Sequence, residues 1–385
     1  MTAPERPRPG DEPPMDKQSA DVVEELVLNM GPQHPATHGV LRLVLRLQGE
    51  RVLECTPYVG YLHRGIEKIL ENRTFNQGVR YVDQFDYITN MLNEHAYVGA
   101  IEQIMGVEVP RRAEYIRVIM GELSRCGGHL VGIGSYLLDL GAWTPITYCF
   151  RDREEILDLY EMVCGSRMNF NYYRAGGLLY DLPTGFLSRL EGFLKKFERN
   201  LDELEDLVSG NEIFLARTVG IGYISPEMGL AYSVSGPCIR ASGVEFDVRT
   251  FRPYGVYPEL GVKPVVRLEG DCFARYEVRL YEMRESIRLI RLAMERLPGG
   301  PIQARLPHVV RPPKGEACYS VEGAKGEMAV YMVSDGQSPN PYRAKVRGPS
   351  FVNLQILPEL VKDATMADVV SILGSIDIVL GEVDR

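Results

Sequence analysis

The stretch Gly31-Pro32-Gln33-His34-Pro35-Ala36-Thr37-His38-Gly39 holds two of the chain's six histidines, four residues apart. On a helix this spacing would bring both imidazoles to one side, but Pro32 and Pro35 argue against a helix, because proline lacks an N–H and favours extended geometry before it. The apolar runs at 25–30 and 40–48 predict flanking strands. We therefore predict a stiff loop that presents the imidazoles of His34 and His38, and imidazole is the one side chain whose unperturbed charge change falls near neutral pH. A rigid turn with two surface histidines and no chemistry would give the same pattern.

Composition and charge place the chain among globular proteins and exclude some partners. The 385 residues are 45% hydrophobic and 25% charged, which is ordinary for a chain of two or three domains. The formal net charge of -9 disfavours nucleic acid as a partner, because binding phosphates needs a basic face. No apolar run approaches the roughly 20 residues of a membrane span. We therefore expect any contact with a membrane to come through partner subunits.

The seven cysteines are widely spaced, and no two form a C-x-x-C pair. This spacing disfavours a zinc ribbon, a thioredoxin-type motif and an iron–sulfur cluster ligated by this chain. It fits reduced thiols in the cytosol. No glycine-rich phosphate loop follows a predicted strand, so nothing supports nucleotide binding. We therefore predict that the chain supplies no metal ligands.

The hydrophobic pattern divides the chain into four parts and predicts an α+β fold. Residues 1–22 are rich in proline and charge, which predicts a flexible arm with no signal or transit peptide. Residues 23–60 predict a small β unit that contains the loop with the two histidines. Residues 61–210 predict a helical bundle, and residues 211–385 a mixed α/β region.

Individual elements follow from the same periodicity. The predicted helices cover 62–72, 83–106, 111–141, 152–165, 184–208, 273–297 and 365–373, the last with Thr365 and Asp368 placed as a capping box. The predicted strands are 25–30, 40–48, 51–57, 326–333 and 341–347. Residues 211–262 predict loops with short strands. Acid–base pairs in 273–297, such as Glu285 and Arg288, predict a solvated face.

The predicted helix at 111–141 contains four glycines at positions 127, 128, 132 and 134. Each costs about 1 kcal/mol relative to alanine, so we expect another helix or chain to approach closely there. Arg125 and His129 share one face of this helix. Asp139 lies in an apolar turn about 15 Å along the axis from His129, so the two residues belong to different places. A helix–helix contact with a satisfied polar group at each end is the alternative without chemistry.

Seven motifs carry a specific resemblance, and they are Gly31–Gly39, Tyr61–Gly65, Asp139–Ala142, Arg240–Gly243, Lys325–Glu327, Pro349–Phe351 and Gly374–Arg385. In these motifs, and in their order, the chain resembles the D-type, or 49-kDa, subunit family of proton-pumping NADH:quinone oxidoreductase, respiratory complex I. The resemblance runs from about residue 25 to the last residue.

The resemblance implies a fold similar to the large subunit of nickel–iron hydrogenases. Those proteins hold their metals with two C-x-x-C pairs, whereas the matching positions here read His63-Arg64-Gly65 and Gly381–Arg385. Nickel needs such thiolates, so hydrogenase activity is excluded. The resemblance implies instead that the former metal cavity binds the headgroup of a quinone, ubiquinone or menaquinone. A [4Fe–4S] cluster held by the neighbouring B-type subunit of the complex would lie beside it.

The resemblance also implies roles for single residues. His38 and Tyr87 match the two residues that hydrogen-bond the quinone carbonyls, and Asp139 matches the carboxylate that partners the histidine. We expect these three to supply protons while electrons arrive from the cluster. Arg64 and His129 match residues beside that cluster. His34, on the same loop as His38, is expected to help form the binding site.

The implied setting is a peripheral subunit on the cytoplasmic face of the bacterial cell membrane, with the B-type, C-type and membrane-embedded H-type subunits as partners. The chain departs from the family at Arg174-Ala175-Gly176-Gly177, where proline is common at the second position. It also runs almost directly from Pro298 to Lys314, without an additional helical segment. Relatives that take electrons from ferredoxin share this shortening.

Three electron donors therefore stay open, namely NADH, ferredoxin and a reduced deazaflavin. A scaffold that only holds its neighbours together is the alternative without catalysis. The presence of His38, Tyr87 and Asp139 argues against it, because a scaffold needs no titratable triad.

Overall fold

The computed structural model describes residues 25–34 and 39–385, and the predicted arm at 1–22 lies outside the described residues. A small antiparallel sheet comes first, in the order β1-β2-β3, made of β1 (Glu25–Met30), β2 (Arg42–Gln48) and β3 (Arg51–Tyr58). Leu43, Leu45 and Leu47 of β2 alternate with more exposed residues and are buried. This alternation is what a strand with one face on the core requires. The three predicted strands at 25–30, 40–48 and 51–57 are confirmed, although the second begins at Arg42.

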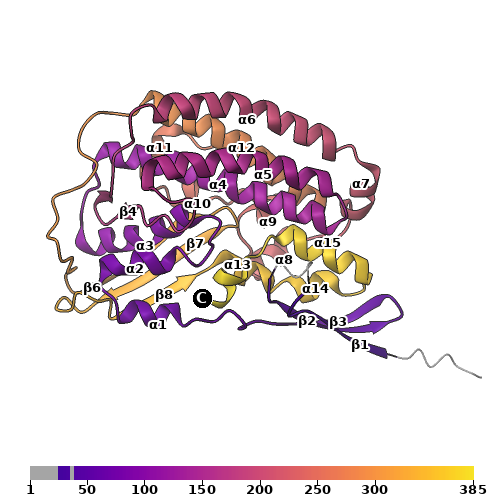
Figure 1. The fold of residues 1–385 in the computed structure, drawn as a ribbon. Coiled ribbons are helices and arrows are strands. Elements are labelled where there is room, and N and C mark those ends of the chain that lie inside the picture. The colour runs from indigo at the N-terminus through magenta and orange to yellow at the C-terminus, as the bar shows by residue number, and fades with distance from the viewer. Residues whose placement is uncertain (1–24, 35–38) are drawn as a thin grey trace, which may run out of the picture.

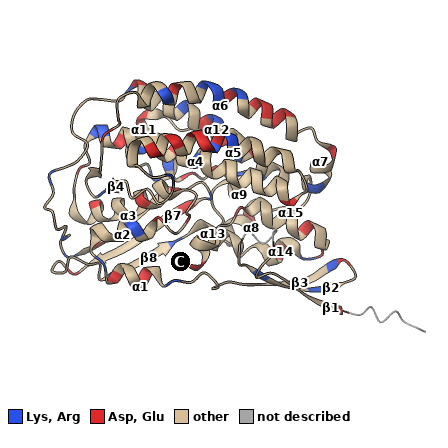
Figure 2. Cartoon of the chain, viewed as in Figure 1, with Lys and Arg blue, Asp and Glu red and all other residues tan. Residues whose placement is uncertain are grey.

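The helical body is built around one long central helix, and Figure 1 shows the long helices stacked above the sheets. Its members are α1 (Ile66–Glu71), α2 (Phe75–Val82), α3 (Asn90–Met105), α4 (Arg111–Asp139), α5 (Trp143–Cys164), α6 (Phe186–Val208) and α12 (Cys272–Glu295). Helix α4 packs against both α5 and α12. Figure 2 shows many charged residues along helix α6, on the outside of the body. The buried stripe of α6 is core packing, as its periodicity predicts.

Three predicted helix boundaries are wrong. The first helix begins at Ile66 instead of residue 62, because Gly65 adopts a left-handed conformation with φ 65° just before it. The predicted helix at 83–106 is shorter, since α3 starts at Asn90 and α2 ends at Val82. Helix α5 begins at Trp143, nine residues before the predicted start at 152. The intervening turn between α2 and α3 is the segment that carries Tyr87.

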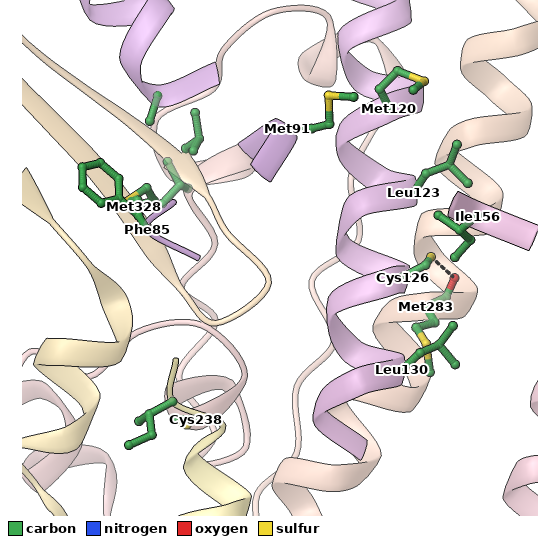
Figure 3. Close-up of a cluster of buried hydrophobic side chains, with 14 of the residues drawn as sticks. Phe85, Met91, Met120, Leu123, Cys126, Leu130, Ile156, Cys238, Met283 and Met328 are labelled. Atoms are coloured by element: carbon green, nitrogen blue, oxygen red, sulfur yellow. Dashed lines mark hydrogen bonds between the residues drawn. The ribbon is translucent and has the colours of Figure 1, made fainter. Parts of the chain in front are cut away.

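The core along α4 is visible in Figure 3, where Met120, Leu123, Cys126 and Leu130 project from the helix. They face Ile156 of α5 and Met283 of α12, and all six side chains are buried. Cys126 Sγ lies 4.0 Å from the carbonyl oxygen of Met283, which ties α4 to α12. This thiol is therefore part of the packing between the two helices.

Three of the four glycines confirm the predicted close approach to α4, and the approaching groups come from this same chain. At Gly127 the nearest atom to an added Cβ would lie 4.0 Å away, which is an ordinary contact. A Cβ atom at Gly128 would lie 2.6 Å from Thr89 Cγ2, and one at Gly132 would lie 2.7 Å from an oxygen of Asp377. At Gly134 the nearest atoms belong to Ile146 and Cys149 of α5, at 3.3 Å. A larger side chain at these positions would push α4 away from its neighbours.

A second antiparallel sheet has the order β6-β7-β8, made of β6 (Gly315–Glu322), β7 (Glu327–Ser334) and β8 (Arg343–Arg347). The last two confirm the predicted strands, and β6 was not predicted. Helix α3 covers β6 and β7. A two-residue pair, β4 (Tyr173–Arg174) and β5 (Gly177–Leu178), forms a short hairpin beside α2 and α3 (Figure 1).

The prediction of short strands in 211–262 is wrong. This region forms the short helices α7 (Glu212–Thr218), α8 (Pro226–Ala231), α9 (Pro237–Arg240), α10 (Val248–Phe251) and α11 (Tyr257–Leu260). Asn211, Ser225 and Asp247 cap three of them through their side-chain oxygens. Proline in the first turn, as in α8 and α9, starts a helix without losing a backbone hydrogen bond.

The chain continues through α13 (Pro349–Leu354), α14 (Leu357–Val361), α15 (Met366–Ile376) and α16 (Leu380–Asp384). The predicted capping box is confirmed, since Thr365 and Asp368 bond reciprocally at the start of α15. The predicted solvated face of α12 holds only in part at the Glu285–Arg288 pair, because Arg288 is 32% exposed but Glu285, 2.5 Å away, is 9% exposed. It fails for Arg275 and Arg279, which are buried against Ser375 and the carbonyl of Ile376. Two of the α12 arginines are therefore core residues.

Candidate functional site

The segment from Leu380 to Asp384 lies buried where several parts of the chain meet, close to the C label in Figure 1. The Asp384 carboxylate accepts hydrogen bonds from the backbone N–H groups of Gly60 and Leu62, at 2.7 and 2.6 Å. The ring nitrogen Nδ1 of His63 lies 2.7 Å from the Asp384 carbonyl oxygen. The segment that follows β3 is thereby fixed to α16.

Arg64 joins this segment to the turn that carries Tyr87. Its Nη2 donates to the carbonyl oxygen of Gly381 at 3.2 Å and to that of Gln84 at 2.9 Å. Burial lowers the pKa of Arg64, while Asp384 and Tyr87 raise it in part. Arg64 therefore holds the three segments of the chain together.

Tyr87 lies between α2 and α3, and its side chain is 39% exposed. A Cβ atom at Gly381 would lie 3.3 Å from Tyr87 Cδ1, so the ring packs on α16. Burial raises the pKa of the Tyr87 phenol, Asp86 raises it further, and Lys325 and Arg64 oppose them. The phenol is therefore protonated at neutral pH and can act as a hydrogen-bond donor.

The loop between β1 and β2 reaches the same place. His34 and Gly39 form an isolated β-bridge that closes the loop, and His34 is exposed. A Cβ atom at Gly39 would lie 3.2 Å from Leu380 Cδ1, so the end of the loop contacts α16. His38 lies outside the described residues. Leu380 thus touches the end of the loop, and its neighbour Gly381 touches Tyr87.

Asp139 is the last residue of α4 and is half-buried. Three positions earlier, the Tyr136 hydroxyl shares a hydrogen bond of 3.0 Å with Ser371 Oγ of α15. Helix α15 leads directly into Asp377 and α16. The C-terminal end of α4 is therefore tied to the element that precedes the Tyr87 contact.

His129 is in a different environment. It is fully buried, and its Nε2 lies 2.8 Å from Glu282 Oε2 of α12. Glu282 also pairs through Oε1 with Arg240, at 2.5 Å. Burial lowers the pKa of His129, and Glu282 offsets part of that effect. The structure does not bring His129 to the surface beside Tyr87, and the expected place of Arg64 and His129 beside a cluster stays a prediction.

Sequence reasoning missed a buried charged cluster directly behind Tyr87. Lys325 Nζ lies 3.4 Å from carboxylate oxygens of both Asp86 and Asp377, and all three residues are buried. Burial lowers the pKa of Lys325, but Asp377 and Asp86 outweigh it and the pKa is raised. Lys325 therefore remains charged between two carboxylates.

Glu382 completes this cluster. Its carboxyl accepts a hydrogen bond from the Ser350 hydroxyl and one from the Ser350 N–H at 3.3 Å. Burial, and then Asp86, raise the pKa of Glu382 to about 8. The available sequence signal was the pair of acids, Asp377 and Glu382, inside the apolar run Ile376–Val383. Buried carboxyl groups of this kind need partners, which the motifs around Lys325 and Ser350 supply.

A second buried cluster lies along α4 and α12 and was also missed. The Glu122 carboxylate accepts hydrogen bonds from Arg249 Nη1 at 3.0 Å, from Arg125 Nε at 3.1 Å and from the Ser286 hydroxyl at 2.6 Å. Burial opposes its charge, yet the two arginines hold the pKa of Glu122 at about 2. Every charge in this cluster has a partner in the core, so it holds α4, α10 and α12 in register.

Among residues 25–34 and 39–385, no group of three or more His, Cys, Asp or Glu side chains is arranged to hold a metal ion. The seven cysteines are free thiols. In the same part of the chain, no helix combines the length and the apolar character needed to cross a bilayer.

Comparisons with known proteins agree with one another. A family model described as the 49-kDa subunit of respiratory-chain NADH dehydrogenase matches residues 139–314 and 304–385. The D-type subunit of NADH-quinone oxidoreductase from Clostridium beijerinckii is 50% identical over 362 residues, covering 94% of this chain and 98% of the relative. The D-type subunits from Desulforamulus reducens and Carboxydothermus hydrogenoformans are 51% and 49% identical, each over 361 residues and 94% of this chain, and 98% and 99% of the relatives.

Proposed function

This chain belongs to the family of the 49-kDa subunit of respiratory-chain NADH dehydrogenase, and from that premise we propose that it is the quinone-site subunit of a membrane-associated NADH:quinone oxidoreductase. In this role it binds the quinone headgroup and supplies protons. Electrons come from a [4Fe–4S] cluster in the neighbouring B-type subunit. The B-type, C-type and membrane-embedded H-type subunits are the proposed partners, and the cytoplasmic face of the membrane is the proposed location.

The observation that carries the proposal is the meeting of three segments at Leu380 and Gly381. The end of the histidine loop contacts Leu380, the partly exposed Tyr87 contacts Gly381, and Arg64 binds the Gly381 carbonyl. A hydroxyl donor and an imidazole-bearing loop beside one apolar residue suit a flat ring with two carbonyl oxygens. Such a site combines apolar walls with a few placed polar groups.

Quinone reduction consumes two electrons and two protons, and this chain's residues would handle the protons. Tyr87 donates one hydrogen bond through its protonated phenol, and His38 is the proposed second donor. Asp139 is the proposed carboxylate that favours the charged form of His38. The cluster of Lys325, Asp86 and Glu382 lies behind Tyr87 and fixes the electrostatic potential at the phenol.

The electron donor of the complex is inferred from the relatives. The relatives described above are named NADH-quinone oxidoreductases, which supports NADH over ferredoxin or a reduced deazaflavin. The subunits that receive electrons from the donor are other chains. The subunit composition of the purified complex decides between the donors.

Replacing Tyr87 with phenylalanine tests the proposed role, because it removes one hydroxyl and leaves the ring packed on Gly381. Loss of a hydrogen bond made in the transition state costs a few kcal/mol, or about 10²-fold in rate. We expect quinone reduction to fall by this factor while the assembled complex still reduces a hydrophilic acceptor. Tyr180→Phe, at a 57% exposed position away from the site, is the matched control. Equal loss of both activities, or no loss, would overturn the role and favour a scaffold.

A further inference from the structure

A groove of about 570 Å³ lies beside the α2 helix, on the side of β4, and is lined by Arg73, Asn76, Gln77, Arg80, Tyr81, Asn171 and Arg174. Helix α2 and β4 are in contact, and Figure 1 shows them next to each other. Three of its seven lining residues are arginines. No carboxylate is among them, although the whole chain has a formal charge of -9.

The three arginines are held by uncharged partners. Arg80 donates to the carbonyl oxygen of Asn169 at 3.4 Å, and Arg174 to that of Asn171 at 2.8 Å. The Arg73 guanidinium lies 5.9 Å from the centre of the Tyr81 ring. Within the described part of the chain, none of the three forms an ion pair with a carboxylate within 4.0 Å, in contrast to Arg117, Arg240 and Arg249 of the core.

The loop at residues 169–171, whose carbonyl oxygens accept hydrogen bonds from Arg80 and Arg174, has an unusual backbone. Asn169 and Asn171 adopt left-handed conformations, with φ of 55° and 48°. Such conformations cost free energy and persist where the surroundings fix them. Here the Asn171 N–H donates to Asp83 at 3.0 Å, and the N–H groups of Tyr172 and Tyr173 donate to Glu94.

The two anchoring carboxyl groups leave the groove positive. Burial, and then Glu94, raise the pKa of Asp83 to about 11, so Asp83 is protonated at neutral pH. The pair therefore fixes the loop without placing two negative charges beneath the arginines. The result is a preorganised basic groove, which lowers the entropic cost of binding an anion.

We propose that this groove docks an acidic segment of a neighbouring polypeptide. A guanidinium group presents a planar fork that matches a carboxylate. Arg73 lies just before Thr74, the N-cap of α2, and Arg80 lies in the last turn of this eight-residue helix. At 1.5 Å per residue the helix is roughly 12 Å long, so the two arginines flank a span that exceeds the reach of one small anion. Two or more carboxylates on one extended segment fit this spacing. The inference requires only that the chain works beside other polypeptides, and it is independent of the quinone site.

Site-specific photo-crosslinking in the assembled complex identifies the occupant. A benzoylphenylalanine at Asn76, which is exposed at the groove, is illuminated and the linked peptide is sequenced. We expect a peptide from another subunit that contains Asp or Glu. Cross-links only within this chain, only to lipid, or to a peptide without acidic residues would overturn the proposal.

Charge reversal then measures the contribution of the arginines. The double variant Arg73→Glu and Arg80→Glu changes two exposed side chains and should leave the fold intact. We expect retention of the linked subunit in elevated salt to fall about tenfold. Arg199→Glu changes the charge of an arginine on α6, away from the groove, and should retain the subunit as the parent does. If the double variant retains the linked subunit as well as the parent does, the proposal is overturned. Replacing the acidic residues of the linked peptide with lysine should restore its binding to the double variant.

Discussion

Arg64 donates a hydrogen bond from Nη2 to the carbonyl oxygen of Gly381, 3.2 Å away, across 317 positions of sequence. The same guanidinium binds the carbonyl of Gln84, three residues before Tyr87. One side chain therefore fixes the distance between α16 and the Tyr87 turn. A substitution at Gly381 should therefore shift the position of Tyr87 although the phenol itself is unchanged.

Gly381→Ala should disturb the site through the backbone. The added Cβ would lie 2.7 Å from the carbonyl oxygen of Phe85, 3.1 Å from that of Gln84 and 3.3 Å from the Tyr87 ring. Backbone atoms must then shift, which costs about 1–3 kcal/mol for overpacking of this kind. We expect quinone reduction to fall at least tenfold while the hydrophilic acceptor is still reduced.

Gly192→Ala is the matched control for this substitution. Gly192 lies in α6, where an added Cβ would have no neighbouring atom within 4 Å. Alanine favours a helix by up to about 1 kcal/mol over glycine, so this variant should be neutral or slightly stabilised. Similar activity in the two variants would contradict the proposed link between Gly381 and Tyr87.

Glu382 should make stability depend on pH. The raised pKa of about 8 means that the folded chain keeps a proton which the unfolded chain loses above its ordinary value of 4.5. Stability therefore falls as pH rises from that ordinary value towards 8, and the effect ends above it. Glu382→Gln resembles the protonated form. In the parent the free energy of unfolding should fall on the order of 2 kcal/mol between pH 6 and 8, and the variant should not show this fall.

Thermal unfolding of the assembled complex at pH 6 and pH 8 measures this effect. Glu245→Gln, at a position away from this cluster, should keep the pH dependence of the parent. If Glu382→Gln shows the same difference between the two pH values as Glu245→Gln, the buried carboxyl is not the group that titrates.

Much of the fold was predictable because local patterns agree with the packing. Each of three local patterns predicts one feature of a single element, and the structure has that feature. They are the apolar stripe of α6, the capping box at Thr365 and the glycines of α4. Prediction failed where irregular chain takes its shape from caps and prolines, as in α7–α11. It also failed at β6, whose sequence Gly315–Glu322 gains its strand character from pairing with β7.

The candidate site was predictable only in part. Motifs pointed to Tyr87, Arg64 and the histidine loop, and the structure joins them at α16. The contacts of Gly39 with Leu380 and of Gly381 with Tyr87 join segments far apart in sequence, which no local pattern encodes. The cluster around Lys325 has the same character, because its charges come from three separate segments.

His129 gives a prediction about stability. Its imidazole supplies a partner to Glu282 Oε2 inside the core, at 2.8 Å. His129→Leu removes it and should cost about 1–3 kcal/mol, whereas His129→Gln keeps an N–H donor and should cost less. Burial lowers the pKa of His129, so the parent loses stability as pH falls below the ordinary value of 6.5. Between pH 7 and pH 5.5 the His129→Gln variant should lose less stability than the parent, as measured by thermal unfolding at both pH values.

The same variant also tests the expectation taken from the resemblance. If His129 stands near the cluster of the neighbouring subunit, His129→Gln should flatten the pH dependence of that cluster's midpoint potential. An unchanged slope in a fully assembled complex would leave His129 with the structural role alone.

The last prediction concerns Asp139 and His38 as a proposed pair. A carboxylate close to an imidazole favours its charged form and raises its pKa above about 6.5. The imidazolium would then hold its proton at low pH and lose it as pH rises through the raised pKa. Asp139→Asn keeps the shape and removes the charge, so the alkaline limb of the quinone-reduction profile should move to lower pH. Asp206→Asn, an exposed position on α6, should leave the limb in place. An Asp139→Asn profile that superimposes on the parent's, at full assembly, would show that Asp139 does not tune His38, and proton supply would then have to be assigned to Tyr87 and the cluster behind it.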